Sequence, residues 1–238
     1  MDKLSSANVL DFTKVKSICW LVYLLLFLVL IVSFADGQNG YASQEQVLFL
    51  TRLNQPLDQE WEHQKFVNET RYTLVREEGK PAIQAVGQES SSGLYKKISY
   101  SPKEYPWLKW EWKLEKAQKT ADLNIEEKED MALGVFIIFP HSWLLPWKTK
   151  SIAYVWTGAK HQPGNIVMNP HHPYFVLQAG DEKKGQWITE RRNIYEDYKR
   201  VWGAYPEKNA KALGLYTDND QTKEPVVGYY GPIKAIKK

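Results

Sequence analysis

The chain almost lacks cysteine, since Cys19 is the single one among 238 residues. Cys19 lies inside an apolar N-terminal run, so the part of the chain after that run cannot form an intramolecular disulfide. That part is about 200 residues long, which is enough for one domain to bury a core without disulfides or a metal. The scarcity of cysteine fits any compartment and does not by itself indicate the cytosol.

The chain also has little excess of charge of one sign. The 31 lysines and arginines nearly balance the 28 acidic residues, which leaves a formal net charge of +3. A nucleic-acid binder needs a strongly basic face or stripe. No such cluster is visible in the sequence, so we expect no nucleic-acid partner.

Several catalytic motifs are missing from the sequence. It has no Gly-x-Ser-x-Gly nucleophile elbow, no Walker loop and no dinucleotide-binding fingerprint. Carboxylates are plentiful, so a glycosidase pair stays open; it needs two carboxyl groups about 5–10 Å apart in space. The histidines lack the ligand spacing of a zinc site; they are His63, His141, His161, His171 and His172.

The N-terminal segment predicts export. Residues 18–32 are uninterrupted hydrophobics, and Lys14 and Lys16 precede them. Lysine before such a run keeps that end in the cytoplasm and sends the C-terminal side across the membrane. Ser33-Phe34-Ala35 then supplies small residues at the two positions that a signal peptidase reads.

The apolar run allows two interpretations, because it is long for a signal-peptide core and slightly short for a transmembrane helix. Either residues 1–35 are a cleaved signal peptide, or residues 18–34 stay as a helix that tethers the protein to the cytoplasmic membrane. Both place the rest of the chain in the periplasm or elsewhere outside the cytoplasm. Residues 36–50 open with Asp-Gly-Gln-Asn-Gly and are predicted to be a flexible linker, and residues 51–238 to be the folded domain.

The predicted domain is mostly β. In residues 107–115, Trp110, Trp112 and two leucines alternate with lysine and glutamate, which indicates a strand with one buried and one wet face. Both tryptophans are therefore predicted to be buried. Residues 131–139 are apolar on both faces, as in a central covered strand. Further strands are predicted at 72–75, 82–87, 93–100, 151–157, 174–179, 186–190, 211–217 and 226–236.

One short helix is predicted over residues 193–202. Asn193 can cap its first turn, Ile194 and Tyr198 share one face, and Gly203 ends it. Many short strands separated by turn residues favour a sandwich or a barrel.

Seven segments stand out in a fixed order, namely 72–75, 92–95, 108–112, 153–156, 187–193, 214–222 and 228–231. In this order they resemble family 3047 of the bacterial domains of unknown function. The resemblance covers about residues 60–233 and implies an exported antiparallel β-sandwich, similar to jelly-roll and galactose-binding-like folds. It implies no assigned activity. It places an acidic pair, Glu129 and Asp130, before the central strand, and an acidic loop late in the chain.

Three oxygen-bearing side chains alternate in that late loop, namely Asp218, Asp220 and Thr222. Hard oxygen ligands at this spacing can hold calcium, although the EF-hand pattern fails because Lys223 occupies its glycine position. The alternative is a solvated turn whose side chains bond their own backbone.

Two further sets are candidate ligand-binding residues. Trp143 and Trp147 lie in a predicted loop that contains Pro140 and Pro146, where exposed aromatics can stack on sugar rings or enter a membrane interface. Arg191 and Arg192 precede the predicted helix and can bind a carboxylate or phosphate, or else form an ion pair with Asp197.

The sequence leaves three functions open. The first is a non-catalytic binding or assembly module of the cell envelope, whose partner is a saccharide or an envelope protein, and the membrane itself if residues 18–34 are retained. The second is an envelope glycan hydrolase that uses paired carboxylates such as Asp130 and Asp218. The third is a purely structural interaction domain.

Overall fold

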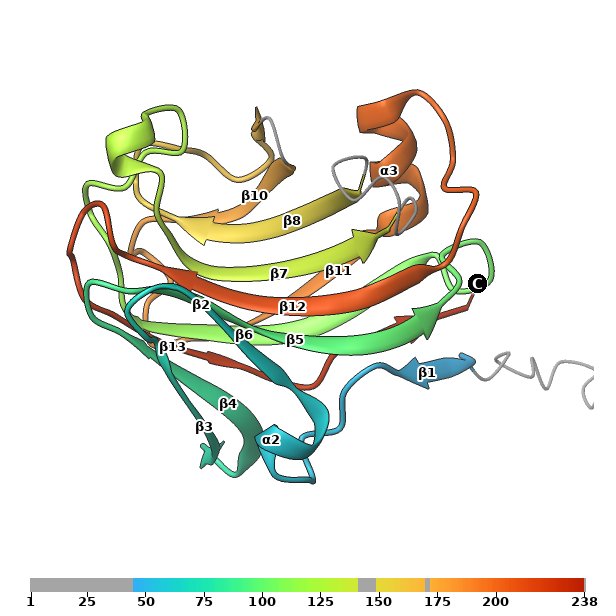
Figure 1. Ribbon diagram of the computed structural model, residues 1–238, viewed down its shortest axis with the longest axis horizontal. Coiled ribbons are helices and arrows are strands. Elements are labelled where there is room, and N and C mark those ends of the chain that lie inside the picture. The colour runs from blue at the N-terminus through green and yellow to red at the C-terminus, as the bar shows by residue number, and fades with distance from the viewer. Residues whose placement is uncertain (1–44, 141–148, 170–171, 238) are drawn as a thin grey trace, which may run out of the picture. The chain divides into compact units, whose positions relative to one another are not determined.

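Two seven-stranded sheets pack face to face in the computed structural model, which describes residues 45–140, 149–169 and 172–237 (Figure 1). These residues belong to one unit that begins at Glu45. The predicted signal or anchor segment lies outside the described residues. Among the helices that the structure does describe, none has the length and apolar character needed to span a membrane.

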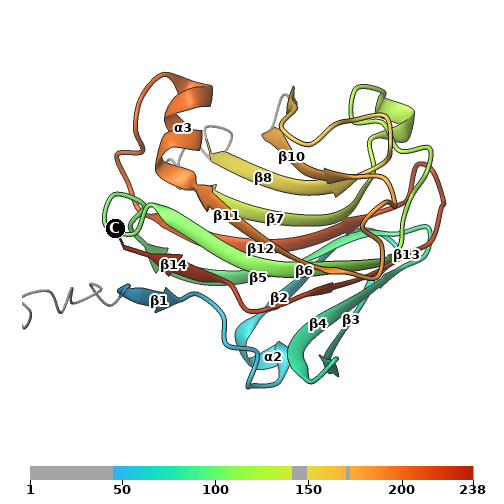
Figure 2. The ribbon, with the colours of Figure 1, turned by 180° about the vertical axis from the view of Figure 1, so that it is seen from behind.

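Sheet A is built around β6 (Trp107–Lys116). β11 (Trp187–Asn193) pairs with one side of it, and β14 (Lys234–Ile236) and β13 (Val226–Tyr230) pair in succession with the other (Figure 2). The sheet continues from β13 to β4 (Lys80–Gly87) and β3 (Arg71–Glu77), and from β14 to β1 (Val47–Phe49).

Sheet B contains the longer, bowed strands that lie side by side in Figure 1. Neighbouring strands are antiparallel, except for the parallel pair β8 and β10. The predicted antiparallel sandwich is therefore confirmed, with this one local exception. The strand order is β2 (Glu62–Val67), β5 (Ser91–Tyr100), β12 (Ala210–Asp218), β7 (Met131–Phe139), β8 (Lys150–Thr157), β10 (Pro173–Ala179) and β9 (Ile166–Met168).

The predicted helix is confirmed as α3 (Ile194–Trp202). Asn193 Oδ1 accepts a hydrogen bond from the Glu196 amide at 3.1 Å, which satisfies one of the free amides of the first turn. Gly203 ends the helix at a φ of 73°, a left-handed conformation that glycine adopts without a steric penalty. The other described helical segments are short: α2 (Leu57–Glu60) and the 3-10 turn η2 (Glu126–Lys128).

Two sequence predictions need correction. Residues 226–236 form two strands instead of one, because Pro232 has no amide to donate and the Ile233 amide donates to the Thr51 hydroxyl at 2.8 Å. The folded part also begins before residue 51, since β1 lies within the predicted linker and pairs with β14. No sequence pattern predicted β1, β2, β9 or α2.

A cluster of aromatic side chains joins the two sheets. Trp110 and Trp112 of β6 are 1% and 0% exposed, which confirms their predicted burial. The Trp110 ring centroid lies 5.4 Å from that of Tyr154, and the Trp112 centroid lies 6.0 Å from that of Trp156. Tyr154 and Trp156 belong to β8, so these contacts connect the centre of sheet A to sheet B.

Lys113 departs from the predicted alternation on β6. It belongs to the wet face by position, yet it is only 4% exposed. Its ammonium group donates to Glu77 at 2.8 Å, Glu78 at 2.6 Å and Glu115 at 2.8 Å. Two of these glutamates lie at the end of β3 and the turn after it, so the β3–β4 hairpin covers this part of the outer face of sheet A.

Truncation of a joining tryptophan should destabilise the whole domain. We expect Trp110→Ala and Trp112→Ala each to lower the free energy of unfolding by about 3–5 kcal/mol, as large aromatic-to-alanine changes in cores do. Trp107→Ala is the matched control, because Trp107 lies on the same strand but is only partly buried. Urea denaturation of the three variants measures the difference. Equal losses for Trp107 and Trp110 would contradict this account of the core.

Candidate functional site

The outward face of sheet B carries a hollow of about 480 Å³. Alternate residues of the sheet face away from sheet A and form a second apolar cluster, which includes Phe136 and Tyr174. The hollow lies beside this cluster and combines aromatic with acidic and hydroxyl side chains. Its lining residues from strands are Phe66, Val67, Ser91, Tyr95, Phe136, Tyr174, Tyr216 and Asp218, and those from connections are Glu126, Glu129, His172, Asp220 and Gln221.

A row of rings crosses the hollow from β2 to the start of β10. Ring centroids lie 5.9 Å apart for Phe66 and Tyr216, and 5.7 Å apart for Tyr216 and Phe136. The row continues with 5.2 Å from Phe136 to His172 and 4.7 Å from His172 to Tyr174. Each pair meets edge to face, a favoured geometry for aromatic rings. Phe66 is 58% exposed, so one end of the row is open to solvent.

Glycines lie beneath the row. Tyr216 is paired across the sheet with Gly93 of β5 and Gly134 of β7. A Cβ atom at Gly93 would lie 2.8 Å from the Tyr216 ring, and one at Gly134 would lie 2.8 Å from the Phe136 ring. The rings therefore pack directly against the backbone of these glycines, and a larger residue at either position would displace them. Glycine within a strand is often found where another group approaches the backbone this closely.

Carboxylates gather at one end of the hollow. Asp218 ends β12 and is paired with Met131, the first residue of β7. This register places Asp218 and Asp220 beside Asp130, which precedes β7. One oxygen atom of each of these three aspartates lies within 4.8 Å of the other two. Glu129 lines the same hollow.

Asp130 is held by the loop that follows β12. Its Oδ2 atom accepts from the Thr222 amide at 2.7 Å and from the Thr222 hydroxyl at 2.5 Å, and Oδ1 accepts from the Gln221 amide at 3.3 Å. Burial raises the pKa of Asp130 although these hydrogen bonds favour its charged form. Burial also raises the pKa of Asp218 well above its ordinary value, and the neighbouring Asp220 and Asp130 add to this effect.

Glu129 is fixed from the other side of the hollow. Its Oε1 atom accepts from the Tyr174 hydroxyl at 2.8 Å and from the Asn169 amide nitrogen at 2.5 Å. Burial, followed by the nearby Glu129 carboxylate, raises the pKa of Tyr174. Tyr174 is therefore a hydrogen-bond donor at all ordinary pH values.

Two of the three residues predicted as calcium ligands lie together in the structure, and the third does not join them as a ligand. Asp218 and Asp220 do meet, as a common metal ligand set requires. The Thr222 hydroxyl donates to Asp130 instead, so Asp130 takes its place as the third oxygen-bearing residue of the cluster. Calcium binding itself stays a prediction.

Of the other predicted ligand-binding residues, Arg191 and Arg192 are described and do not line the hollow. Trp143 and Trp147 lie outside the described residues. The Arg191 guanidinium lies over the Trp107 ring at 4.3 Å. Arg192 forms a bidentate ion pair with Asp197, with Nε–Oδ2 and Nη2–Oδ1 distances of 3.0 Å and 2.6 Å.

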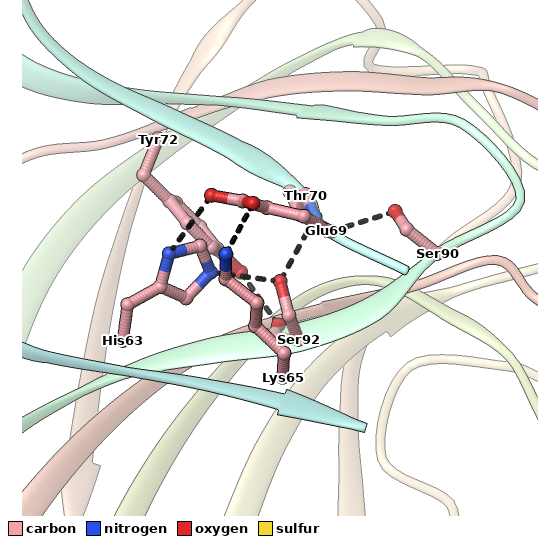
Figure 3. A network of polar contacts seen from close by, with 7 residues as sticks. All are labelled: His63, Lys65, Glu69, Thr70, Tyr72, Ser90 and Ser92. Carbon is pink, nitrogen blue, oxygen red and sulfur yellow. Dashed lines mark hydrogen bonds and ion pairs between the residues drawn. The ribbon is translucent and has the colours of Figure 1, made fainter. Parts of the chain in front are cut away.

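A second polar cluster joins β2, β3 and β5 and is drawn in Figure 3. The His63 Nε2 atom lies 3.0 Å from the Ser92 hydroxyl, and His63 Nδ1 lies 3.4 Å from Glu69 Oε1. This order of serine, histidine and carboxylate is that of a hydrolase triad. Ser92, however, is fully buried, and its hydroxyl accepts the Thr70 amide at 2.9 Å. The cluster therefore ties the β2–β3 connection to β5 and offers no nucleophile to a substrate.

Most residues of the hollow were not predicted as site residues. Phe136 and Tyr216 lie in segments that were correctly predicted as strands, but which face each ring takes depends on the sheet register. The one available signal was Gly134, a glycine within the otherwise apolar run 131–139. The reason why glycine is needed at this position is visible only in the structure, where the Phe136 ring lies over Gly134.

Fold and site together define a two-sheet β-sandwich with an aromatic and acidic hollow on the outer face of one sheet. The sequence model of the family described as "Protein of unknown function (DUF3047)" matches residues 59–234, and the chain belongs to this family. No curated protein matched the sequence.

The similarity to solved structures is low. The family 30 carbohydrate-binding module of a Clostridium thermocellum cellulosomal cellulase is 10% identical; the alignment covers 75% of this chain and 91% of that one, with a TM-score of 0.44. Endoglucanase cel12A from Rhodothermus marinus is 9% identical, with coverages of 75% and 96% and a TM-score of 0.42. The xyloglucanase domain of NopAA from Sinorhizobium fredii is 8% identical, with coverages of 82% and 98% and a TM-score of 0.41.

The Arg192–Asp197 pair should stabilise the packing of α3. Asp197 is 6% exposed and also accepts from the Tyr154 hydroxyl at 2.8 Å. We expect Asp197→Asn to lower the free energy of unfolding by about 2–3 kcal/mol, since hydrogen bonds to charged groups contribute about 1.5–3 kcal/mol. Glu45→Gln is the control, because it alters the exposed partner of Arg191 and should change little. Chemical denaturation that shows no difference between the two variants would refute the role assigned to Arg192.

Proposed function

We propose that the chain is an exported saccharide-binding module and that the hollow on sheet B is its binding site. The observation that carries the proposal is the row of rings laid down over glycine backbone beside a group of carboxylates. Small-molecule sites combine an apolar surface with a few polar groups that fix orientation, in volumes of about 300–1,000 Å³.

The two kinds of side chain match the two kinds of surface on a sugar. One face of a pyranose ring presents C–H groups, which pack on the negative face of an aromatic ring such as Tyr216 or Phe66. The hydroxyl groups at the ring edge need acceptors, and the oxygens of Glu129 and Asp220 line the same hollow. A neutral or amine-bearing saccharide suits these acceptors better than an acidic one, because like charges repel.

The export part of the proposal is supported by the lysine-flanked apolar run at residues 18–32. A reporter enzyme fused after Lys238, active only outside the cytoplasm, should therefore be active. Substitution of the run by polar residues is the control and should abolish the signal. Activity of a reporter that works only inside the cytoplasm would contradict export.

A hydrolase is the second candidate function, and one observation favours it. One oxygen of Asp130 lies within 4.8 Å of one oxygen of Asp218, as a pair of acting carboxylates requires, and burial raises the pKa of Asp218 in the direction that suits a general acid. Product analysis of any glycan that binds separates the two functions. A binding module leaves the glycan intact, and a hydrolase releases shorter sugars.

Screening of the full-length protein on a glycan array should give binding that depends on the row of rings. We expect Tyr216→Ala and Phe66→Ala to weaken binding about 10-fold each, since one aromatic contact contributes about 0.5–1.5 kcal/mol beyond its buried area. Phe49→Ala is the matched control, because Phe49 is also an exposed phenylalanine, at 42%, but lies on sheet A, away from the hollow. Its affinity should match that of the wild type.

Two results would overturn the saccharide proposal. One is the absence of any glycan ligand for a protein that is folded by circular dichroism. The other is a glycan ligand whose affinity is unchanged by Tyr216→Ala and Phe66→Ala.

A further inference from the structure

Three aspartates form a compact oxygen cluster at the acidic end of the hollow. Asp130 precedes β7, Asp218 ends β12, and Asp220 follows in the adjoining turn. One oxygen from each lies within 4.8 Å of the others. Calcium binds oxygens at about 2.3–2.6 Å, so two ligands on opposite sides of one ion are about 5 Å apart. The three oxygens are thus close enough to contact a single ion.

Two of the three carboxylates are almost completely shielded from solvent. Asp130 is fully buried and Asp218 is 7% exposed. Within residues 45–140, 149–169 and 172–237, no lysine or arginine forms an ion pair with any of the three carboxylates. Buried charges are ordinarily paired or bound to a metal, because an isolated one is costly. The cluster therefore needs a positive partner or protons.

An independent observation indicates a missing ligand. Asp218 Oδ1 and Asp220 Oδ1 are buried and have no hydrogen-bond donor in the described part of the chain. Most buried polar atoms in proteins have a partner, and an atom without one calls for an explanation such as an ion. Asp218 is more than nine-tenths buried, and the two atoms belong to the carboxylates that make up the cluster.

We propose that Asp130, Asp218 and Asp220 bind a divalent cation that prefers oxygen ligands, with calcium as its first representative. All three ligands are carboxylates, and neither histidine nor cysteine belongs to the cluster, as suits a hard cation. The remaining positions around the ion are open to water, because Asp218 and Asp220 line the hollow.

The surrounding loop holds the first ligand in position. The Thr222 amide and hydroxyl both donate to Asp130 Oδ2, at 2.7 Å and 2.5 Å. Such hydrogen bonds to a ligand fix its orientation, and their loss typically lowers metal affinity about 10–100-fold. Thr222 is therefore a positioning residue for the cation, where its place in the sequence had made it a candidate ligand.

The cation proposal does not rest on saccharide binding, because cation affinity is measured on the protein alone. Full-length protein stripped with EDTA is titrated with CaCl₂ and MgCl₂ by isothermal titration calorimetry, with thermal unfolding followed in parallel. We expect one site per chain, and an unfolding temperature that rises with calcium, since a ligand specific to the folded state stabilises it.

Variants locate the site. Asp218→Asn keeps the side-chain shape and should weaken binding at least about 10-fold, and Thr222→Val should weaken it about 10–100-fold. In EDTA, Asp218→Asn should unfold no earlier than the wild type, because a neutral amide replaces a buried carboxyl group that lies beside two other carboxyl groups. Asp181→Asn is the matched control, as Asp181 lies exposed in the turn after β10, and should bind like the wild type.

Two results would overturn the proposal. The first is a folded wild-type protein that binds neither cation at millimolar concentration, in which case the carboxylates share protons. The second is binding that Asp218→Asn and Thr222→Val leave unchanged, which would place the ion elsewhere.

Discussion

The contact of Trp110 and Trp112 with Tyr154 and Trp156 connects the two sheets, and the location of the candidate site follows from it. Side chains alternate along a strand, so once Tyr154 and Trp156 face sheet A, the register of sheet B determines which neighbours face outward. A slip of one residue in this register would turn Phe136 toward sheet A and Val135 toward the outer face. The site on the outer face therefore depends on the packing of the inner face.

The hollow combines features that reduce stability with features that favour binding. Glycine weakens strands β5 and β7, yet it lets the Tyr216 and Phe136 rings lie close to the sheet. Three carboxylates at one end repel each other, yet their oxygens converge. Proteins commonly accept such destabilising features at functional sites. The polar cluster of Figure 3 differs, because Ser92 and His63 are satisfied by their neighbours and serve the fold.

Local patterns in the sequence predicted the sandwich and part of the site. Alternation over 107–115 was sufficient to predict burial of Trp110 and Trp112. The spacing of Asp218 and Asp220 made them candidate calcium ligands; they do lie close together, and calcium binding stays a prediction. Asp130 and Asp218 were named together as an example of a hydrolase pair, but their closeness comes from the pairing of β7 with β12, which no local pattern encodes. β1 and β9 have only three residues each, too few for a period to be visible.

Crystals of the protein grown with calcium and the best glycan from the array test the central claim most directly, that the outer face of sheet B is the ligand site. We predict density for a sugar ring over the Tyr216 ring and an anomalous peak among Asp130, Asp218 and Asp220. A saccharide bound at Trp143 and Trp147, or on the outer face of sheet A, with no peak among the three aspartates, would contradict the account.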